Sequence, residues 1–338
     1  MQNNDTVLFV SPGPDLNNPA SGEGTRLRNL SLELSECGWQ VFTLVPEKTD
    51  DTTPDWVTKQ YRYRQWSLPH LTDLNPFFLM TLKRVLSKED IDVIHLSTGV
   101  CTAKLLTLID SDTTVVYAAQ NVEADHAQDF VDPDLPIYKR LLGPQLIPLI
   151  EWATVRCSDG ITTVSDKDKK RFTDRYGLSN HKMKTIPTGT TVVSRSKLED
   201  PSDIRDHLNI NSNRVAVFHA DYAHPPNLEA ARLIDKQIAP VMTEQNIDLS
   251  FILVGNDPPN VSSPNVHTTG FVENILSVLN VADVAVVPIL HGGGTKTKIY
   301  DYISLALPIV ATKKAVEGID LTDGVHACIT KYSDEGII

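Results

Sequence analysis

One segment, residues 291–312, limits the possible folds more than any other part of the chain. Its sequence is HGGGTKTKIYDYISLALPIVAT, and a strand-like run of apolar residues, 284–289, precedes it. The three glycines are followed by a predicted helix over residues 295–306 and then by a β-branched run, 309–312. Strand, glycine turn, helix and strand together form the unit from which parallel α/β sheets are built. The predicted fold class is therefore α/β.

The glycine turn has the properties of an anion-binding site. Gly292, Gly293 and Gly294 have no Cβ atoms, so their backbone N–H groups can approach a ligand closely. A helix that begins at Thr295 would direct its positive end toward the same place. We expect a phosphate group to bind there.

Lys298 and Asp301 refine this expectation. They are three residues apart, so on a helix they share one face, with the lysine nearer to the anion. A lysine at this place suits a diphosphate, and a carboxylate one turn further along suits sugar hydroxyls. The spacing alone is equally consistent with a solvent-facing ion pair on an ordinary helix.

The segment GGGTKTKIYDYISLALPIVAT resembles the donor-binding segment of family-4-type glycosyltransferases, which have the GT-B fold. In the relatives of this subtype the pattern G-x-G-T-(R/K)-x-K-x-x-E-A is followed by a short run ending in P-V-V-x-T. The match at the same spacing covers Gly292, Gly294, Thr295, Lys296, Lys298, Pro308 and Thr312. Asp301 takes the place of the family's glutamate and is one methylene shorter.

The resemblance implies two Rossmann-like domains facing a cleft, and transfer of a sugar from a nucleotide-sugar donor with retention of configuration. The acceptor would be a glycan or a lipid-linked glycan. Lys298 would stabilise the leaving diphosphate, and Asp301 would hold the ribose. The glycine turn, Thr295 and Gly255 would complete the donor site. No cofactor is expected, because the nucleotide sugar is a substrate. No metal is expected, because a lysine and a helix end would stabilise the charge of the leaving diphosphate.

The N-terminal half carries the predicted acceptor side. Residues 11–24 form a long loop after the first predicted strand, and they lack the G-x-G-x-x-G pattern of dehydrogenases. In the family this loop is rich in glycine and ends in an arginine, which corresponds to Gly24 and Arg26 here. A surface loop with a solvated arginine is the alternative interpretation.

Two further strands end in polar residues that are candidates for the catalytic site. The strand predicted over residues 92–96 brings His95 to its carboxyl end, where open α/β sheets bind ligands. A structural histidine is the alternative. After the next strand, Asn121 and Glu123 match a family H-N-x-E motif, with Gln120 in place of the histidine. We therefore expect Asn121 on the acceptor side, and His95 and Glu123 among the catalytic residues.

Length and motif order predict two domains. A chain of 338 residues exceeds one ordinary hydrophobic core. The motif Ile-Pro-Thr-Gly at residues 186–189 resembles the family's I-P-N-G and closes the first domain. We expect an N-terminal acceptor-binding domain over 1–189, a polar linker over 190–202 and a donor-binding domain over 203–338. Family members continue several tens of residues further, so the second domain is expected to be truncated.

Composition excludes several classes of protein. Hydrophobic residues make up 41% and charged residues 22%, which indicates a globular chain, and a net charge of −12 argues against nucleic-acid binding. The four cysteines are scattered without a C-x-x-C motif, which favours a reducing, cytoplasmic location. The apolar run at the N-terminus follows no basic residues, so we interpret it as a strand and not a signal peptide.

Two segments raise the question of peripheral contact with the inner face of a membrane. Residues 61–66 interleave aromatic and basic side chains, and we interpret them as an edge strand with solvated arginines. Residues 76–86, PFFLMTLKRVL, form an amphipathic helix with a basic end. A helix that packs on the core is the preferred interpretation, and membrane contact is the alternative.

Two other functions remain open at this stage. A nucleotide-sugar 2-epimerase would share the two-domain plan but would need no acceptor. A degenerate, non-catalytic binding protein would explain three departures from the family motifs, Gln120, Thr188 and Ala220, as well as the short C-terminus. The donor sugar, the nucleotide base and the oligomeric state are not predicted.

Overall fold

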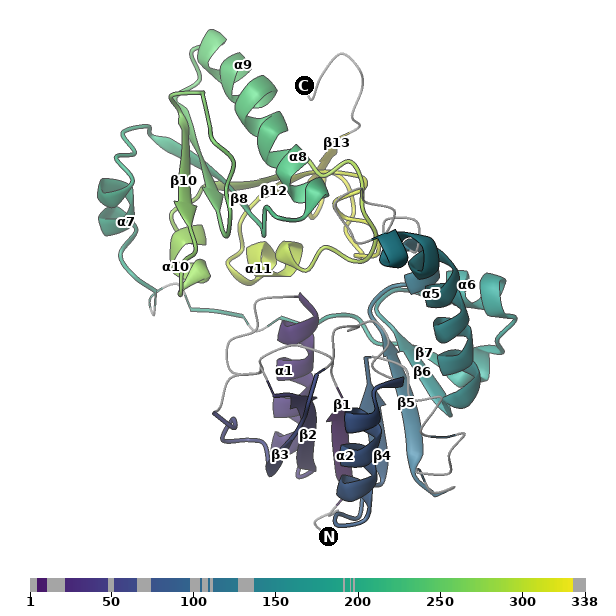
Figure 1. Cartoon of the computed structure of the whole chain (residues 1–338). Helices are drawn as coiled ribbons and strands as arrows, with labels where there is room; N and C mark the ends of the chain where they lie inside the picture. The colour runs from purple at the N-terminus through teal and green to yellow at the C-terminus, as the bar shows by residue number, and fades with distance from the viewer. Residues whose placement is uncertain are drawn as a thin grey trace. The chain divides into compact units, whose positions relative to one another are not determined.

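The computed structural model describes residues 5–10, 22–47, 52–65, 74–97, 104, 109, 112–126, 137–190, 192–194, 196 and 198–330, without the side chains of 22–23, 137–144 and 180. The chain divides into two compact units, Met1–Thr188 and Gly189–Ile338 (Figure 1). Most of the predicted loop 11–24 and the last eight residues lie outside the described residues.

The first unit is built on a sheet of seven parallel strands in the order β3-β2-β1-β4-β5-β6-β7. The strands are β1 (Thr6–Val10), β2 (Gln40–Pro46), β3 (Lys59–Tyr63), β4 (Val93–Leu96), β5 (Thr114–Ala119), β6 (Gly160–Thr163) and β7 (Met183–Thr185). The predicted edge position of the strand with tyrosines and arginines is confirmed, because among the described strands β3 pairs with β2 alone.

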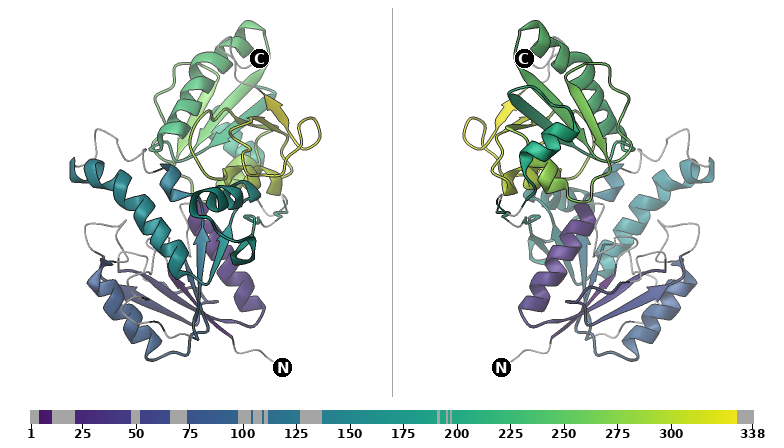
Figure 2. Two further views of the ribbon diagram at one scale, coloured as in Figure 1. Left: turned by 90° about the vertical axis from the view of Figure 1, so that its right-hand side faces the viewer. Right: turned by 90° about the vertical axis from the view of Figure 1, so that its left-hand side faces the viewer.

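Alternating side chains of β1 divide the core of this unit into two layers. Val7 and Phe9 pack with Leu27 of α1 (Gly22–Glu36). Leu8 and Val10 point to the other face and belong to the cluster that includes α2 (Pro76–Leu86). Figure 2 shows α1 and α2 on opposite sides of the sheet. A sheet covered on both faces explains why its central strands are almost wholly apolar.

The other helices described in the first unit are α4 (Glu123–His126), α5 (Ile137–Cys157), α6 (Asp166–Tyr176) and the 3-10 turn η3 (Asn180–Lys182). The side chain of Ser165 accepts a hydrogen bond from the backbone N–H of Asp168, so Ser165 is the N-cap of α6. Asn75 caps α2 in the same way, through the N–H of Phe77, and Pro76 occupies the first helical position.

The second unit contains a sheet of six parallel strands in the order β10-β9-β8-β11-β12-β13. The strands are β8 (Arg214–His219), β9 (Leu249–Val254), β10 (Val266–Gly270), β11 (Val284–Val287), β12 (Ile309–Thr312) and β13 (Cys328–Thr330). The central strands β8 and β11 are neighbours although β9 and β10 lie between them in the chain. The strand order therefore reverses between β8 and β11, and ligands of open α/β sheets bind at such a reversal.

The helices of the second unit are α7 (Pro201–His207), α8 (Pro225–Leu233), the π-helical segment η5 (Ile234–Ile238), α9 (Ala239–Glu244), α10 (Ile275–Leu279) and α11 (Lys298–Ser304). In Figure 1, α8 and α9 form one continuous rod joined by the π-helical segment.

Within the described part of the chain, no helix has both the length and the apolar character needed to cross a membrane.

Candidate functional site

The glycine turn lies directly after the carboxyl end of β11. Gly292 and Gly294 have φ angles of +91° and +65°, which favour glycine over residues with a side chain. A Cβ atom on Gly292 would lie 3.2 Å from Cγ of Pro226, at the start of α8. The turn is therefore packed closely against the first turn of α8.

The predicted start of the next helix is wrong. α11 begins at Lys298 and not at Thr295, and Thr297 is its N-terminal flanking residue. Nζ of Lys296 donates hydrogen bonds to the carbonyl oxygens of Gly293 and Gly294, at 2.5 and 2.9 Å. These bonds close the turn on itself before the helix starts. The N–H groups of the glycine turn thus do not form the first turn of α11, and the helix is only seven residues long.

Lys298 is brought into contact with two other elements. Its Nζ donates a hydrogen bond to Oδ1 of Asn227 in α8, at 2.8 Å. The same nitrogen lies 4.4 Å from the ring centroid of Phe218 in β8, a cation–π geometry. Only 9% of Lys298 is exposed, so this ammonium group is nearly removed from water.

Burial has a large effect on the proton affinity of Lys298. It lowers the pKa of Lys298 from 10.5 to about 7, with a smaller contribution from the positive charge of Lys296. The negative charge of Asp301 raises the pKa of Lys298 and so opposes this change. A lysine at this pKa gains its proton readily when a negative ligand arrives, because the ligand's charge offsets the desolvation.

Asp301 forms a network that the sequence analysis did not find. Its Oδ2 lies 3.1 Å from Nε2 of His219, the last residue of β8. Nδ1 of His219 lies 2.9 Å from the hydroxyl of Tyr302, which also accepts the backbone N–H of His219 at 3.0 Å. A histidine at the carboxyl end of a central strand is the signal that led to His95, and the same signal applied to β8 would have identified His219.

Gly255 follows β9 and touches the backbone after β8. Its φ is +128°, and a Cβ atom there would lie 1.9 Å from the carbonyl oxygen of Ala220. The two chain segments at the carboxyl ends of β8 and β9 are therefore in direct backbone contact. This close packing by itself requires glycine at position 255.

In the first unit, His95 is buried and lies against Phe9, with 4.7 Å between ring centroids. Burial, and secondarily the charge of Arg26, lower the pKa of His95 to about 4, so the imidazole is neutral at pH 7. Nδ1 of His95 has no hydrogen-bond partner among the described residues. A buried imidazole nitrogen without a partner is uncommon in a purely structural histidine.

Arg26 is buried and not solvated. Its guanidinium group donates to the carbonyl oxygen of Ile186 at 2.6 Å and to the hydroxyl of Thr188 at 3.3 Å. It thereby ties α1 to the chain after β7. Gly24 lies two residues earlier, in the first turn of α1, and is also buried.

Asn121 and Glu123 contact each other, because Nδ2 of Asn121 donates to Oε1 of Glu123 at 2.9 Å. The backbone N–H groups of Glu123 and Ala124 donate to the carboxylate of Glu151 at 2.7 and 3.0 Å. Tyr176 donates a third hydrogen bond to Glu151, whose pKa is raised by burial. Glu151 therefore anchors the start of α4 and with it the position of Glu123.

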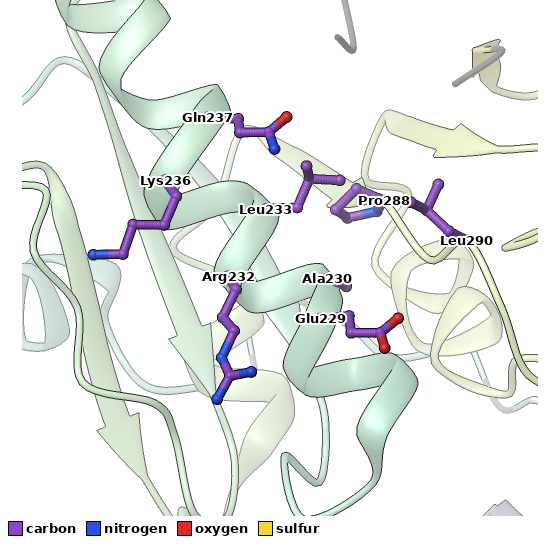
Figure 3. A pocket seen from close by; sticks show the side chains of 8 residues that line it. All are labelled: Glu229, Ala230, Arg232, Leu233, Lys236, Gln237, Pro288 and Leu290. Atoms are coloured by element: carbon purple, nitrogen blue, oxygen red, sulfur yellow. The ribbon is translucent and has the colours of Figure 1, made fainter. Parts of the chain in front are cut away.

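The second unit also has a surface hollow of about 390 Å³, and its lining does not include Lys298, Asp301 or His219. Figure 3 shows it between α8 and the segment that carries Pro288 and Leu290; its lining is completed by Glu229, Ala230, Arg232, Leu233, Lys236 and Gln237. Asn227 and Glu229 are two residues apart on α8, so they point to different sides of the helix. We place the candidate site at Lys298 and Asp301, where buried polar groups converge, and not in this hollow.

The described residues contain no group of three or more His, Cys, Asp or Glu side chains that could hold a metal ion.

Each unit is an α/β unit with a sheet of parallel strands, and the second unit has a glycine turn where its strand order reverses. These features define a Rossmann-like protein with a candidate nucleotide-binding site. Residues 20–192 match Glycosyltransferase Family 4, and residues 213–336 match Glycosyl transferases group 1. The first match covers more than half of the chain. The chain therefore belongs to Glycosyltransferase Family 4, and it is a glycosyltransferase with the GT-B fold.

Solved structures agree on the fold. The chain is similar to sucrose-phosphate synthase from Thermosynechococcus elongatus, with a TM-score of 0.69 and 17% identity over 97% of this chain and 86% of that chain. It is similar to a glycosyltransferase from Rickettsia africae, with a TM-score of 0.64 and 11% identity over 97% and 84%. It is also similar to Anabaena HepE in complex with UDP and glucose, with a TM-score of 0.62 and 15% identity over 96% and 85%.

A sequence search of curated proteins finds no match.

Proposed function

We propose that the protein transfers a sugar from a nucleotide-sugar donor to a glycan or lipid-linked acceptor, with retention of configuration. The main observation in support of the donor site is that the Lys298 ammonium is buried beside the glycine turn. Asp301 lies one turn further along α11. Burying a lysine without a carboxylate in contact is unfavourable, which supports a role in binding an anion.

In this proposal the protein supplies charge at the position where charge develops. The acceptor hydroxyl loses its proton, and its oxygen forms a bond to the anomeric carbon of the sugar. The bond from that carbon to the diphosphate breaks, and negative charge accumulates on the leaving diphosphate in the transition state. Lys298 and the backbone N–H groups of Gly293, Gly294 and Thr295 are the donors that would stabilise it. Asp301 would accept hydrogen bonds from the ribose hydroxyls, and the backbone at Gly255 would lie against the donor.

The acceptor side is proposed in the first unit. Arg26 and His95 interact electrostatically, and the Asn121–Glu123 pair is anchored at the start of α4. Nδ1 of the neutral His95 has no partner among the residues that the structure describes, so it can accept a proton or a hydrogen bond from an acceptor hydroxyl. Gly24 would allow the acceptor to approach the backbone closely.

The experiment that tests the donor site is thermal unfolding in the presence of UDP, GDP or ADP. UDP comes first because the similar HepE structure contains it. A nucleotide at about 100 times its dissociation constant adds about 2.7 kcal/mol to the free energy of unfolding. We expect a concentration-dependent rise in Tm with one of the three. No rise with any of them, on a folded sample, would contradict the proposal.

A product assay separates the proposed transferase from the alternatives. A 2-epimerase would release a free isomerised sugar from the nucleotide sugar alone, whereas a transferase would need an acceptor to turn over. A non-catalytic relative would show the rise in Tm with nucleotide but would consume no donor, with or without an acceptor.

The proposal also includes peripheral contact with an anionic membrane through α2. The buried side of α2 consists of Phe78, Leu82 and Val85, which confirms the prediction that the helix packs on the core. The opposite side exposes Phe77 to 40% and Met80 to 70%. Large apolar groups on the outer face of an amphipathic helix are typical of helices that lie in the membrane interface.

Charge on the same surface favours an anionic bilayer. Lys83 and Arg84 are exposed in the last turn of α2, and the guanidinium of Arg64 lies 5.3 Å above the ring of Phe77. This local positive charge contrasts with the net charge of −12 of the whole chain. Each basic residue near an anionic membrane surface contributes about 1 kcal/mol to binding.

We expect the protein to sediment with vesicles of phosphatidylcholine and phosphatidylglycerol but not with phosphatidylcholine alone. The variant Lys83→Gln/Arg84→Gln should lose about 30-fold in partitioning, because about 2 kcal/mol of attraction is removed. Phe77→Ser/Met80→Ser should also reduce it. Val325→Ser, at an exposed apolar position of the second unit, is the matched control. Equal sedimentation with both vesicle types would contradict the contact.

A further inference from the structure

His219 holds the carboxylate of Asp301 in one orientation. Nε2 of the imidazole lies 3.1 Å from Oδ2, and the imidazole comes from β8 while the carboxylate comes from α11. His219 is 8% exposed, whereas the side chain of Asp301 is 34% exposed. The buried partner therefore fixes the accessible one.

The hydrogen bonds also determine which ring nitrogen carries the proton. The backbone N–H of His219 donates to the hydroxyl oxygen of Tyr302, whose own proton is then free to be donated to Nδ1. Nδ1 is consequently the acceptor, and Nε2 carries the proton and donates it to Oδ2 of Asp301. Tyr302 is fully buried and packs edge-on against the imidazole, with 5.0 Å between the ring centroids.

Neutral imidazole is the state that this arrangement favours. A second proton on His219 would sit on Nδ1 and face a hydroxyl that already accepts one N–H. Burial lowers the pKa of His219, although the contact with Asp301 opposes the change. Lys298 adds a positive charge nearby, which also lowers that pKa. Asp301 therefore receives one directed hydrogen bond from a neutral imidazole.

We propose that His219, with its tautomer set by Tyr302, is a positioning residue of the donor site that orients Asp301 toward the ribose hydroxyls of the nucleotide. This inference rests on the proposed function. His219 itself need not touch the donor. One carboxylate oxygen is engaged by the imidazole, and the exposed part of the carboxylate is left to accept the hydroxyls of the ribose.

The alternative role for His219 is packing alone. The two roles differ in how strongly the site prefers a nucleotide with ribose hydroxyls over one without them. The probe is the nucleoside diphosphate among UDP, GDP and ADP that stabilises the wild type, together with its 2′,3′-dideoxy analogue. The measured quantity is the ratio of the two dissociation constants. A carboxylate held in place makes this ratio large, because the analogue leaves its oxygens without partners.

We expect a ratio of at least about tenfold for the wild type and less than about threefold for His219→Asn, whose shorter amide cannot reach Asp301. His219→Gln, with a donor close to the position of Nε2, should recover most of the ratio. Lys298→Met is the matched control, because it should weaken both ligands equally and leave the ratio unchanged.

Tyr302→Phe preserves the packing and removes the hydroxyl that sets the tautomer, so it tests the inference even if His219→Asn does not fold. Its ratio should fall between those of wild type and His219→Asn. An unchanged ratio in folded His219→Asn or in Tyr302→Phe would overturn the positioning role and leave the donor site standing. Absence of binding to all three nucleotides in the wild type would overturn the donor site and this inference with it.

Discussion

Lys298→Met is expected to raise the stability of the ligand-free protein at pH 7 and to remove most of its affinity for nucleoside diphosphates. In the wild type, the folded-state pKa of Lys298 is about 7, well below the value of 10.5 for an exposed lysine. Between these values the unfolded chain binds more protons than the folded one. The free energy of unfolding of the wild type therefore rises with pH across this window, by up to about 1.4 kcal/mol per unit of pH. Methionine has no charge to bury, so the variant lacks this slope.

Nucleotide binding should have the opposite pH dependence. A diphosphate raises the pKa of Lys298, so binding takes up a proton once the free site has lost it. Affinity should then fall by up to about tenfold per unit of pH above pH 7. Replacing the lysine should cost about 1.5–3 kcal/mol, the value of a hydrogen bond to a charged group, at neutral pH.

Isothermal titration calorimetry in two buffers of different ionisation enthalpy measures the proton uptake directly. The charged and titratable groups around Lys298 are Lys296, Asp301 and His219, and the lowered pKa of His219 keeps that residue out of this pH range. Lys296→Met should shift the transition to higher pH, because the charge of Lys296 lowers the pKa of Lys298. Lys313→Met, on an exposed part of the same unit, is the control. Nucleotide binding whose affinity does not change with pH would refute the role given to Lys298.

Gly255→Ala is expected to destabilise the second unit by at least about 3 kcal/mol, because it combines a positive φ with a severe overlap. The new Cβ would lie 1.9 Å from the carbonyl oxygen and 2.9 Å from the carbonyl carbon of Ala220. Both are backbone atoms, so no side-chain rotation relieves the contact. The carboxyl ends of β8 and β9 would have to separate, and that movement would displace His219 and the start of α8.

Gly324→Ala separates the two contributions to this cost. Gly324 has φ of +73° and open space where a Cβ would be placed. Its replacement should cost only about 1–2 kcal/mol, the cost of the left-handed backbone conformation. Denaturant unfolding of the two variants measures the difference. If Gly255→Ala proved no less stable than Gly324→Ala, the close contact between Gly255 and Ala220 would not exist in solution.

The sequence predicted those parts of the protein that depend on neighbouring residues. The apolar run after Asp5 forms β1, and the helix predicted over residues 76–86 is α2. Each of these signals acts within a few residues, through burial periodicity or a cap. The family motif, which is also a local pattern, identified Lys298 and Asp301 as the pair to examine.

The tertiary structure alone decided what surrounds that pair. Asn227 is 71 residues from Lys298, and His219 is 82 residues from Asp301. These partners come together only when β8 and β11 pair and α8 packs beside the glycine turn, so no local pattern reveals that they are in contact. The start of α11 was mispredicted for the same kind of reason, because Lys296 folds back onto the glycine carbonyls and delays the helix. The sequence by itself therefore determined which residues carry charge at the site, and the fold decided how those charges are buried, paired and oriented.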